Sequence, residues 1–519
     1  MATETELKLR ITPEHLARLR RHRLFKTHQL TAPVTRHLHN IYFDTPKLDL
    51  NKHEMALRLR RVGGRWLQTL KGGGQVRGGL HQRNEWEAPV ASARLDFSVL
   101  EDSVLEAYLP QSLRKKLKPV FVTDFYRTSR MVEYQGAVIE VCMDHGEVKT
   151  SQRSAPICEV ELELKSGEAQ QLFELALAIL EIVPFELEAV SKAERGFRLM
   201  SEFIEQPVKA EQPKLSKKIQ RTELLQTLIW SCLLHLQQNL HGMVAGNHAE
   251  YLHQIRVALR RLRVALGMAA SIHADEQLNA LREEVAALGV TFGRVREWDV
   301  FLVEVMHPAA AQRPGEGAMQ VLLSESEQRR TDSYAALRDT ALTCDIQRLM
   351  LRFALWMNSP YWQQLAADAT DNEGMPSGRD FATRHLHHLA KVYRRELAYL
   401  DRLVASPDIN LYFQQLHALR INVKKLRYSI DFFKYLYGNK KSESYLVALV
   451  SVQETLGKIH DCLMAHRLLE ILSEHSGMSG YAEAVRLIRE NLSQNLSDEL
   501  KLLHKPLERF GKQTAFWKK

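Results

Sequence analysis

The segment Glu4 to Ile11, which reads E-T-E-L-K-L-R-I, constrains the fold of this chain more than any other stretch. Successive side chains of a β-strand point to opposite faces, so this segment has one uncharged face and one wholly charged face when it is extended. The charged face carries both signs, on Glu4, Glu6, Lys8 and Arg10. Such a face suits the wall of a wet cavity that binds a cation and an anion. For this strand alone, an exposed edge whose charges deter pairing is an equally good interpretation.

The same alternation recurs on three further predicted strands. The charged positions that share a face in these strands are Arg58 and Arg60; Arg83, Glu85 and Glu87; and Glu159, Glu161, Glu163 and Lys165. One charged strand can be a sheet edge, but four in one sheet cannot all be edges. The recurrence therefore predicts that the charged faces converge inside a barrel.

The first 200 residues predict an antiparallel sheet or barrel of about eight strands. After the opening strand, the predicted strands are Leu24 to Leu30, Thr35 to Phe43, Glu54 to Val62, Arg65 to Lys71, Gln82 to Glu87, Val120 to Glu133, Ala137 to Asp144 and Ile157 to Lys165. Tight turns are expected at Gly63-Gly64 and at Asp144-His145-Gly146, and Gly72 to Gly74 is expected at a hairpin tip rather than in a phosphate loop.

Carboxylates on neighbouring strands repel one another unless divalent cations lie between them, and an oxygen-rich site suits Mg²⁺ or Mn²⁺. Arginine and lysine side chains on facing strands supply partners for phosphate oxygens. A triphosphate bound with metal satisfies both sets of charges, and its hydrolysis depends mainly on positioning and electrostatic stabilisation.

Residues 1 to about 200 resemble the CYTH family of triphosphate tunnel metalloenzymes. The resemblance rests on an E-x-E-x-K signature in Glu4 to Lys8 and on later segments in the family's order: Tyr42 to Pro46, Leu57 to Arg60, Thr69 to Lys71, Arg83 to Glu85, Arg127, Asp144, Glu159 to Glu161 and Ser191-Lys192. It implies an eight-stranded antiparallel tunnel with metal-dependent phosphate chemistry.

The resemblance also implies roles for individual residues. The expected metal ligands are Glu4, Glu6, Asp144, Glu159 and Glu161, and the expected catalytic residues are Glu4, Glu6, Lys8, Glu85, Glu161 and Glu163. The expected phosphate ligands are Lys8, Arg58, Arg60, Lys71, Arg83, Arg127 and Lys192, the last of which closes the tunnel mouth. Glu163 is included only because it shares the charged strand face with Glu159 and Glu161. Arg10 is equally well interpreted as a solvated residue at the rim of the tunnel.

Composition narrows the class of protein. The net charge of +9 is spread evenly, because residues 1–200 carry 30 basic against 26 acidic side chains, so it does not by itself indicate nucleic-acid binding. Five cysteines form no C-x-x-C pair, which favours a reducing cytoplasm over a disulfide or zinc framework. The chain has no signal-peptide pattern and no membrane-length apolar run. We therefore expect a cytoplasmic protein without a membrane partner.

Residues 203–216 form a predicted linker that contains Pro207 and Pro213, and helical periodicity follows to the end of the chain. An internal repeat marks this half. The motif that runs from His253 to Arg263 recurs from His417 to Arg427, an offset of 164 residues, and the Gly293 to Glu297 motif recurs at the same offset as Gly457 to Asp461. Two motifs with one offset indicate a duplicated helical unit, with its copies at about 245–300 and 409–464.

The first repeated motif places basic residues along one stripe of each helix. These stripes comprise His253, Arg256, Arg260 and Arg263, and His417, Arg420, Lys424 and Arg427. If the duplication brings them together, they form a basic surface for an extended anion. The alternative is that these cations pair with acids on other helices, such as Glu297, Asp299 and Asp461.

Residues 217 to about 505 resemble the all-helical, duplicated CHAD domain. That resemblance implies binding of long-chain inorganic polyphosphate at the two stripes. The predicted architecture is thus a CYTH tunnel at 1–202, a linker at 203–216 and a helical CHAD bundle at 217–519, as in bacterial inorganic triphosphatases. The implied reaction is Mg²⁺-dependent or Mn²⁺-dependent hydrolysis of tripolyphosphate to pyrophosphate and phosphate.

Two classes of alternative stay open. Adenylyl cyclases and thiamine triphosphatases share the tunnel but act on organic triphosphates, and they should need aromatic contacts such as Trp66 or Trp86 beside the phosphates. The second alternative is a protein that is not an enzyme but a binding module for polyphosphate or nucleic acid. The stripes lack the interleaved aromatic residues of a stacking platform, which argues against single-stranded nucleic acid.

Overall fold

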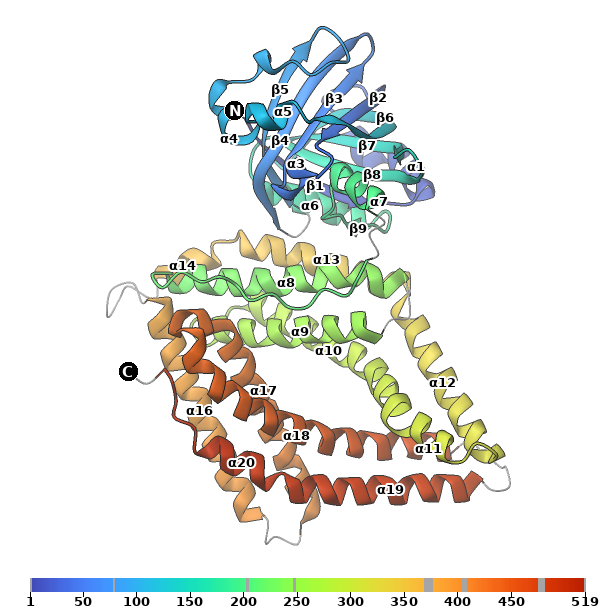
Figure 1. The fold of residues 1–519 in the computed structure, drawn as a ribbon, viewed down its shortest axis with the longest axis vertical. Helices are drawn as coiled ribbons and strands as arrows, with labels where there is room; N and C mark the ends of the chain where they lie inside the picture. The colour runs from blue at the N-terminus through green and yellow to red at the C-terminus, as the bar shows by residue number, and fades with distance from the viewer. Residues whose placement is uncertain are drawn as a thin grey trace. The chain divides into compact units, whose positions relative to one another are not determined.

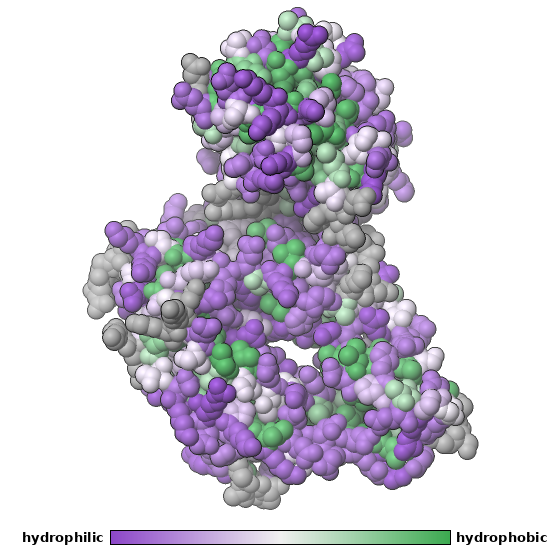
Figure 2. Space-filling model, viewed as in Figure 1, coloured by the Kyte–Doolittle hydropathy of each residue, from purple (hydrophilic) through white to green (hydrophobic). Residues whose placement is uncertain are grey.

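The computed structural model describes residues 2–77, 80–201, 205–245, 249–367, 377–403, 408–474 and 481–517. The chain divides into two compact units, Met1–Gln206 with Thr340–Asn358, and Pro207–Asp339 with Ser359–Lys519. The first is built mainly of strands and the second of helices (Figure 1). The face of each unit seen in Figure 2 is mainly hydrophilic. Among the helices that the structure describes, none combines the length and the apolar character that crossing a membrane requires.

Eight antiparallel strands close the first unit into a barrel, which confirms the predicted fold class. The strand order is β5-β4-β3-β2-β6-β7-β8-β1, and β1 pairs back with β5 to close the ring. The strands are β1 (Ala2–Arg10), β2 (Val34–Asp44), β3 (Ala56–Val62), β4 (Arg65–Arg77), β5 (Leu80–Val90), β6 (Lys118–Tyr134), β7 (Ala137–Lys149) and β8 (Ser154–Ser166). A two-residue strand, β9 (Glu186–Leu187), also pairs with β1.

The register brings the charged faces together inside the barrel. Residues directly opposite each other in an antiparallel pair share a face, and Lys8 lies opposite Glu161. The uncharged face of β1 points outward, where Leu7 and Leu9 are completely buried. Helix α6 (Ala169–Leu180) packs over this face, and burial of each leucine contributes about 2 kcal/mol. The opening strand is therefore a barrel wall and not an edge.

Helix α7 (Lys192–Met200) fills one end of the barrel interior. It begins at Ser191, whose hydroxyl caps the backbone N–H of Glu194. Its Phe197 packs edge to face on Phe121 of β6, within a cluster of apolar side chains from the inner faces of β2, β6, β7 and β8. The close approach requires Gly196, because a Cβ atom there would lie 2.2 Å from the Phe121 ring. The interior is thus apolar where α7 enters and charged beyond it.

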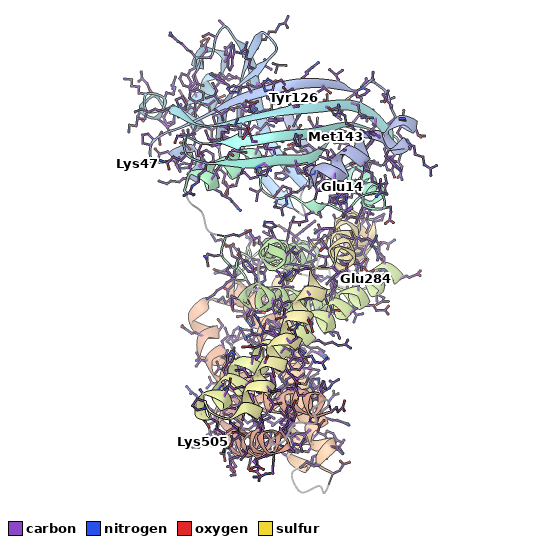
Figure 3. All side chains as sticks on the ribbon, turned by 90° about the vertical axis from the view of Figure 1, so that its right-hand side faces the viewer. Glu14, Lys47, Tyr126, Met143, Glu284 and Lys505 are labelled. Carbon is purple, nitrogen blue, oxygen red and sulfur yellow. The ribbon has the colours of Figure 1, made fainter. Side chains whose placement is uncertain are left out.

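The remaining helices of the first unit lie outside the barrel. They are α1 (Pro13–Arg21), α2 (Arg23–Thr27), α3 (Asp49–Lys52), the 3-10 turn η1 (Phe97–Val99), α4 (Asp102–Tyr108) and α5 (Gln111–Arg114). In the side view of Figure 3, Tyr126 of β6 and Met143 of β7 are labelled on neighbouring strands. Tyr126 is 59% exposed on the outer face, whereas Met143 is buried.

Helix α13 (Thr340–Met357) belongs to the first unit although it lies far along the chain. It packs against α6 and β9, and the side-chain oxygen of Gln347 accepts a hydrogen bond of 3.0 Å from the backbone N–H of Leu187. Arg348 forms an ion pair of 2.9 Å with Glu181. No sequence pattern identified above predicts this return of the chain to the first unit.

Three local predictions were wrong. The segment predicted as a strand from Leu24 to Leu30 begins as the short helix α2, because the His22 side chain caps the N–H of Leu24 and Phe25 is buried. The predicted turn at Asp144-His145-Gly146 is absent, and β7 continues to Lys149. Gly72 to Gly74 is not a hairpin tip but a bulge inside β4, where Gly73 and Gly74 have positive φ.

The second unit is mostly helical within its described residues, with one isolated β-bridge between Gln220 and Ser377. Its helices are α8 (Arg221–Ala245), α9 (Ala249–Ala270), α10 (Glu276–Phe301), the π-turn η2 (Leu302–Met306), α11 (His307–Gln312), α12 (Gly317–Leu337), α14 (Tyr361–Ala367), α16 (Gly378–Leu403), α17 (Ile409–Tyr437), α18 (Asn439–Ser473), α19 (Tyr481–Leu502) and α20 (His504–Gly511). The two copies of the repeat occupy equivalent helix pairs, α9 with α10 and α17 with α18. Part of the predicted linker is held in place, because Val208 bonds with Asn239 and His235 of α8.

Candidate active site in the N-terminal barrel

Three buried carboxylates form the centre of the barrel site. Asp144 of β7 lies opposite Glu159 of β8, and Glu161 is the next residue on the same face of β8. One oxygen from each residue lies within 4.8 Å of the other two, and all three side chains are at most 8% exposed. Three predicted metal ligands are therefore close enough to share one cation.

The ammonium of Lys192, the first residue of α7, lies among these carboxylates. It is 2.6 Å from Asp144 and 2.9 Å from Glu161, and it also bonds Glu159. The ring of Phe125 lies 5.1 Å from the same nitrogen. Burial alone would lower the pKa of Lys192, but Asp144 and Glu161 outweigh burial and raise it. Lys192 is thus a buried cation held at the acidic centre.

Two arginines complete this ion-pair network. Arg127 of β6 donates to both oxygens of Asp144, at 2.8 and 2.7 Å, and also bonds Glu161. Arg195, one turn after Lys192 on α7, bonds Glu159. Burial opposes ionisation of Asp144, but Arg127 and Lys192 hold the pKa of that carboxyl below its usual value. The pKa of Glu161 is lowered in the same way, so Asp144 and Glu161 are ionised and paired with these cations.

Glu6 and Lys8 of β1 extend the network across the next strand. Lys8 lies 2.8 Å from Glu6 and 2.5 Å from Glu161. Burial would raise the pKa of Glu6, but the positive charges around it, Lys8 first and then Lys71, together lower that pKa to about 2. Glu163 lies opposite Glu6, bonds Lys165 at 2.5 Å, and has a pKa that burial raises.

A second ion-pair group lies on the other side of β1. Lys71 of β4 bonds Glu4 and lies 3.2 Å from Glu85 of β5, and Arg58 of β3 lies 3.7 Å from Glu85. Arg83 is half-buried on β5, opposite Glu4. The structure therefore places all the predicted tunnel residues in one interior, with Glu4 and Glu85 grouped apart from the three central carboxylates.

Positive charge is incompletely compensated on the β2–β3 wall. Arg60 is half-buried and donates to the side-chain oxygen of Asn40 at 2.9 Å, and no carboxylate lies within ion-pair distance of it among the described residues. Burial, followed by the nearby Arg58 and Arg127, lowers the pKa of Arg60 to about 10. The Nε of Arg58 is buried without a hydrogen-bond partner in the described part of the chain. This wall has spare donors and positive charge for an anion.

The donor set fits a hard divalent cation. Carboxylate oxygens are the ligands that Mg²⁺ and Mn²⁺ prefer, and Asp144, Glu159 and Glu161 already lie within reach of one position. The guanidinium groups of Arg58 and Arg60 fit phosphate oxygens, which they can bind with paired N–H donors.

Sequence reasoning missed two residues of this site. Arg195 lies three residues after Lys192, so the helical period would have placed both on one face of α7. His81 shares the inner face of β5 with Arg83 and Glu85, but the predicted strand began at Gln82 and excluded it. Burial, followed by the charge of Lys8, lowers the pKa of His81 to about 4. Arg10, the least explained residue of β1, bonds Glu186 of β9.

In the second unit the basic residues of the two repeats converge. The Nε of Arg260 on α9 donates to the hydroxyl of Tyr428 on α17 at 2.9 Å. The ring of His417 on α17 stacks on that of His460 on α18, with centroids 5.8 Å apart. Arg256 packs against Gly293 of α10, where a Cβ atom would approach its guanidinium to 2.9 Å.

Lys424 shows how concentrated this positive charge is. Burial, with the charges of Arg420, Arg260 and Arg256, lowers the pKa of Lys424 to about 6. Asp461 on α18 acts in the opposite direction but does not offset it. Burial and Arg260 similarly lower the pKa of Arg256 to about 10.

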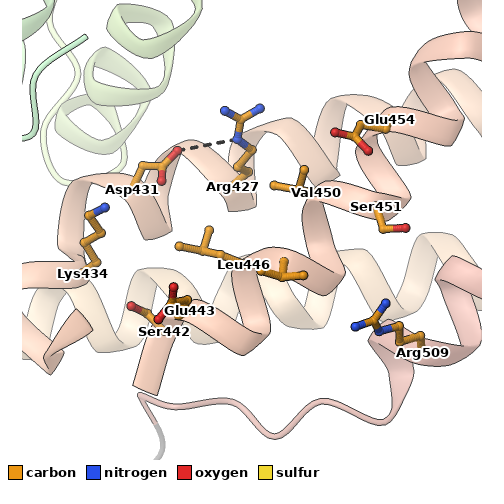
Figure 4. Close-up of a pocket in the computed structure, with 11 residues that line it drawn as sticks. Arg427, Asp431, Lys434, Ser442, Glu443, Leu446, Val450, Ser451, Glu454 and Arg509 are labelled. Atoms are coloured by element: carbon orange, nitrogen blue, oxygen red, sulfur yellow. Dashed lines mark ion pairs between the residues drawn. The ribbon is translucent and has the colours of Figure 1, made fainter. Parts of the chain in front are cut away.

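The last residue of each stripe lies apart from this cluster. Arg427 lines a pocket between α17 and α18, where it pairs with Asp431 at 3.6 Å (Figure 4). It also donates to Gln453 at 3.1 Å. Arg263 is exposed on α9. Asp299, one of the acids considered as a partner for the stripes, bonds Arg330 of α12 instead, at 2.7 Å.

Family models match both halves of the chain, the CYTH domain over residues 2–197 and the CHAD domain over residues 227–470. The chain carries a CYTH domain followed by a CHAD domain. An inorganic triphosphatase of Haemophilus influenzae is 36% identical over 207 residues, which are 39% of this chain and 56% of that protein. The chain thus spans little more than half the length of this relative.

Two solved structures are similar to separate parts of the chain. The CHAD domain of Ricinus communis is 27% identical, covers 60% of this chain and 98% of its own, and has a TM-score of 0.50. A Hippeastrum protein described as having a dominant triphosphatase activity is 19% identical over 39% of this chain and 97% of its own, with a TM-score of 0.29. The first similarity supports the CHAD fold of the helical unit.

Proposed function

We propose that the CYTH domain is a metal-dependent inorganic triphosphatase that hydrolyses tripolyphosphate to pyrophosphate and phosphate. One observation carries the proposal: three carboxylates within 4.8 Å of one another share a barrel interior with Arg60, a half-buried cation without a carboxylate partner among the described residues. A metal and a polyanion together satisfy both groups. The similarity to the Haemophilus influenzae inorganic triphosphatase supports the same reaction.

The residues have separate roles in this proposal. Asp144, Glu159 and Glu161 would hold Mg²⁺ or Mn²⁺, with Glu4, Glu6 and Glu85 further carboxylates in the same interior. The bound ion would neutralise phosphate charge and supply an activated water. Phosphate oxygens would be held by the cations of the tunnel, which are Lys8, Arg58, Arg60, Lys71, Arg83, Arg127 and Lys192. Water adds to the terminal phosphorus as the bridging P–O bond breaks, and the pyrophosphate leaves.

An inorganic substrate is favoured over a nucleotide or thiamine triphosphate. Trp66 and Trp86, the aromatic candidates for an organic group, pack in an apolar cluster with Leu57 and Leu70, and Trp86 also contacts Tyr108 of α4. Neither tryptophan lies on the tunnel face. Trp66 is an odd number of residues from Lys71 on β4, and Trp86 is next to Glu85 on β5, so both point to the opposite face of the sheet.

A substrate panel tests this proposal. Purified full-length protein should release phosphate from tripolyphosphate faster than from ATP or thiamine triphosphate in the presence of Mg²⁺, and EDTA should stop the reaction. Arg60→Gln should slow the hydrolysis of all three substrates at concentrations below KM, because each presents a triphosphate to be bound. If tripolyphosphate is the poorest substrate of the three, the proposed specificity is wrong.

For the CHAD domain we propose binding of long-chain inorganic polyphosphate. The supporting observation is the convergence of Arg256, Arg260, Arg420 and Lys424 from the two repeats, with the Nε of Arg420 buried and unpartnered among the described groups. His253 and His417 flank these cations at the start of each stripe, and Arg263 and Arg427 lie at the far ends. The absence of interleaved aromatic residues along the stripes disfavours single-stranded nucleic acid. The five free thiols support a reducing cytoplasmic location.

Charge reversal tests the CHAD proposal. The full chain should bind long-chain polyphosphate with an affinity that falls steeply with salt, as expected when an anion displaces counterions from a cluster of cations. Reversal of Arg256, Arg260, Arg420 and Lys424 to glutamate should abolish that binding while tripolyphosphate hydrolysis continues. If the quadruple variant binds as the unchanged protein does, the cluster is not the polyphosphate site.

A further inference from the structure

His81 occupies a tunnel position that none of the roles above explains. It lies on β5 directly opposite Glu6 of β1, and it alternates with Arg83 and Glu85 on the inner face of the strand. Its side chain is 1% exposed. An imidazole is thus buried in a wall otherwise made of charged groups, directly opposite a predicted metal ligand.

The hydrogen bonds of His81 fix which ring nitrogen is free. Nε2 lies 3.0 Å from the backbone carbonyl oxygen of Glu188. A carbonyl only accepts, so Nε2 carries a hydrogen, and Nδ1 is the ring nitrogen that a metal ion can bind. Nδ1 is buried and has no hydrogen-bond partner among the described groups. Its lone pair is available for a cation.

The acceptor for His81 is itself held in place by β1. The N–H of Glu188 donates to the carbonyl oxygen of Lys8 at 2.8 Å, and the Glu188 side chain accepts from the N–H of Val190 at 2.8 Å. A metal-bound histidine usually donates its second ring N–H to a carbonyl or carboxylate, which sets the ring orientation. Glu188 gives His81 this arrangement, and it ties the imidazole to the strand that carries Glu6.

We propose that Nδ1 of His81 is a ligand to a divalent cation that Glu6 also binds, and that this nitrogen makes the site favour Mn²⁺ and Co²⁺ over Mg²⁺. The inference rests on the proposed metal dependence of the tunnel. Residues directly opposite each other in an antiparallel pair have Cβ atoms about 5 Å apart, so an imidazole and a carboxylate at these positions can reach one ion. Mg²⁺ prefers oxygen, whereas transition-metal ions accept imidazole nitrogen with affinity that rises from Mn²⁺ to Co²⁺.

Pulsed EPR of Mn²⁺ bound to the metal-free full chain tests the ligand directly. Protein labelled with ¹⁵N only in histidine should show coupling of one nitrogen to Mn²⁺, and His81→Asn should remove it. Calorimetric titration of the variant should show Mn²⁺ and Co²⁺ affinities reduced about 10-fold to 100-fold, with Mg²⁺ affinity changed less than about twofold. His235→Asn is the matched control, because His235 of α8 is also buried, bonds a backbone carbonyl through Nε2 and has an unpartnered Nδ1.

Two results would overturn the proposal. One is Mn²⁺ bound without histidine coupling in the unchanged protein. The other is an equal loss of Mg²⁺ and Mn²⁺ affinity in His81→Asn together with a lower melting temperature, which would mean that His81 only positions Glu188. Neither result decides the proposed reaction, because hydrolysis of tripolyphosphate is measured separately and can persist with carboxylate ligands alone.

Discussion

Lys192 and Asp144 form a buried ion pair of 2.6 Å between the first residue of α7 and the middle of β7. The same ammonium bonds Glu159 and Glu161, so one lysine side chain takes the central position among the three carboxylates. A divalent cation bound by these residues competes with Lys192 for the same oxygens. Metal binding at this position, as proposed above, would therefore free the ammonium of Lys192 for a phosphate oxygen.

Lys192→Met should make the barrel depend on metal for its stability. Removing one partner of a buried ion pair costs about 3–5 kcal/mol, since the remaining charge stays buried. We expect a large fall of the melting temperature in EDTA and a larger recovery with Mg²⁺ than the unchanged protein shows. Lys149→Met, which removes an exposed lysine paired with Glu147 on β7, is the control and should behave as the unchanged protein. Equal Mg²⁺-induced shifts in all three proteins would contradict competition at this position.

Arg60→Gln should separate binding from stability. Burial and like charges already disfavour the charged guanidinium of Arg60, so its loss should leave the melting temperature unchanged or higher. The KM for tripolyphosphate should rise at least about tenfold, as expected for loss of a charge-assisted contact. Arg61→Gln changes the neighbouring exposed arginine and should alter neither quantity. A drop in stability with an unchanged KM would assign Arg60 a purely structural role.

The pKa of Glu6 predicts acid sensitivity. Its folded pKa of about 2 lies below the ordinary value of 4.5, so the ionised form stabilises the fold at pH above about 4.5. That contribution, at most about 3 kcal/mol, is lost as the pH falls from 4.5 towards 2. Chemical unfolding of the unchanged protein and of Glu6→Gln across this range measures it. The difference in unfolding free energy between the two should shrink with falling pH, and a constant difference would contradict the ion pair with Lys8.

Lys424 should make polyphosphate binding tighter at low pH. Its pKa of about 6 means that the side chain is mainly neutral at pH 8 and charged at pH 5, and a bound polyanion favours the charged form. The groups that set this pKa are Arg256 and Arg260 on α9, Arg420 on α17 and Asp461 on α18. Calorimetry in buffers of different ionisation enthalpy should detect uptake of about one proton at pH 7 to 8.

Two variants test whether Lys424 is the group that takes up this proton. Lys424→Met should abolish the proton uptake on polyphosphate binding. Lys425→Met, at the adjacent exposed position, should retain it. Proton uptake that is the same in Lys424→Met would instead point to the histidines His253 and His417, whose pKa values burial also lowers.

The barrel could be predicted from the sequence because the alternation of charged and apolar residues along a strand is a local, periodic pattern. Alternation of charge in β1 and β8 identified the inner face before any strand pairing was known, and the register then placed Lys8 opposite Glu161. Segments without alternation were harder. Leu24 to Leu30 is apolar enough for a strand, and its first half became helical because of the cap that His22 provides and the burial of Phe25.

Tertiary contacts account for what the sequence did not predict. Arg195 and His81 join the site through pairing partners that no local pattern specifies, Glu159 and the carbonyl of Glu188. The packing of α13 on α6 and β9 joins residues about 160 positions apart, as in the bond between Gln347 and Leu187. The repeats predicted that two basic stripes would meet, but only the structure separates Arg427, which pairs with Asp431, from the converged cations.

The measurement that tests the central claim most directly is ³¹P NMR of tripolyphosphate incubated with the full chain. With Mg²⁺, we predict that pyrophosphate and phosphate form in equal amounts, that EDTA prevents their formation, and that Glu161→Gln lowers the rate at least about 100-fold because it disrupts the carboxylate cluster. Glu147→Gln, on the exposed part of β7, should keep the full rate. Tripolyphosphate left intact by the unchanged protein with Mg²⁺ or Mn²⁺, or cleaved equally fast by Glu161→Gln, would contradict the account.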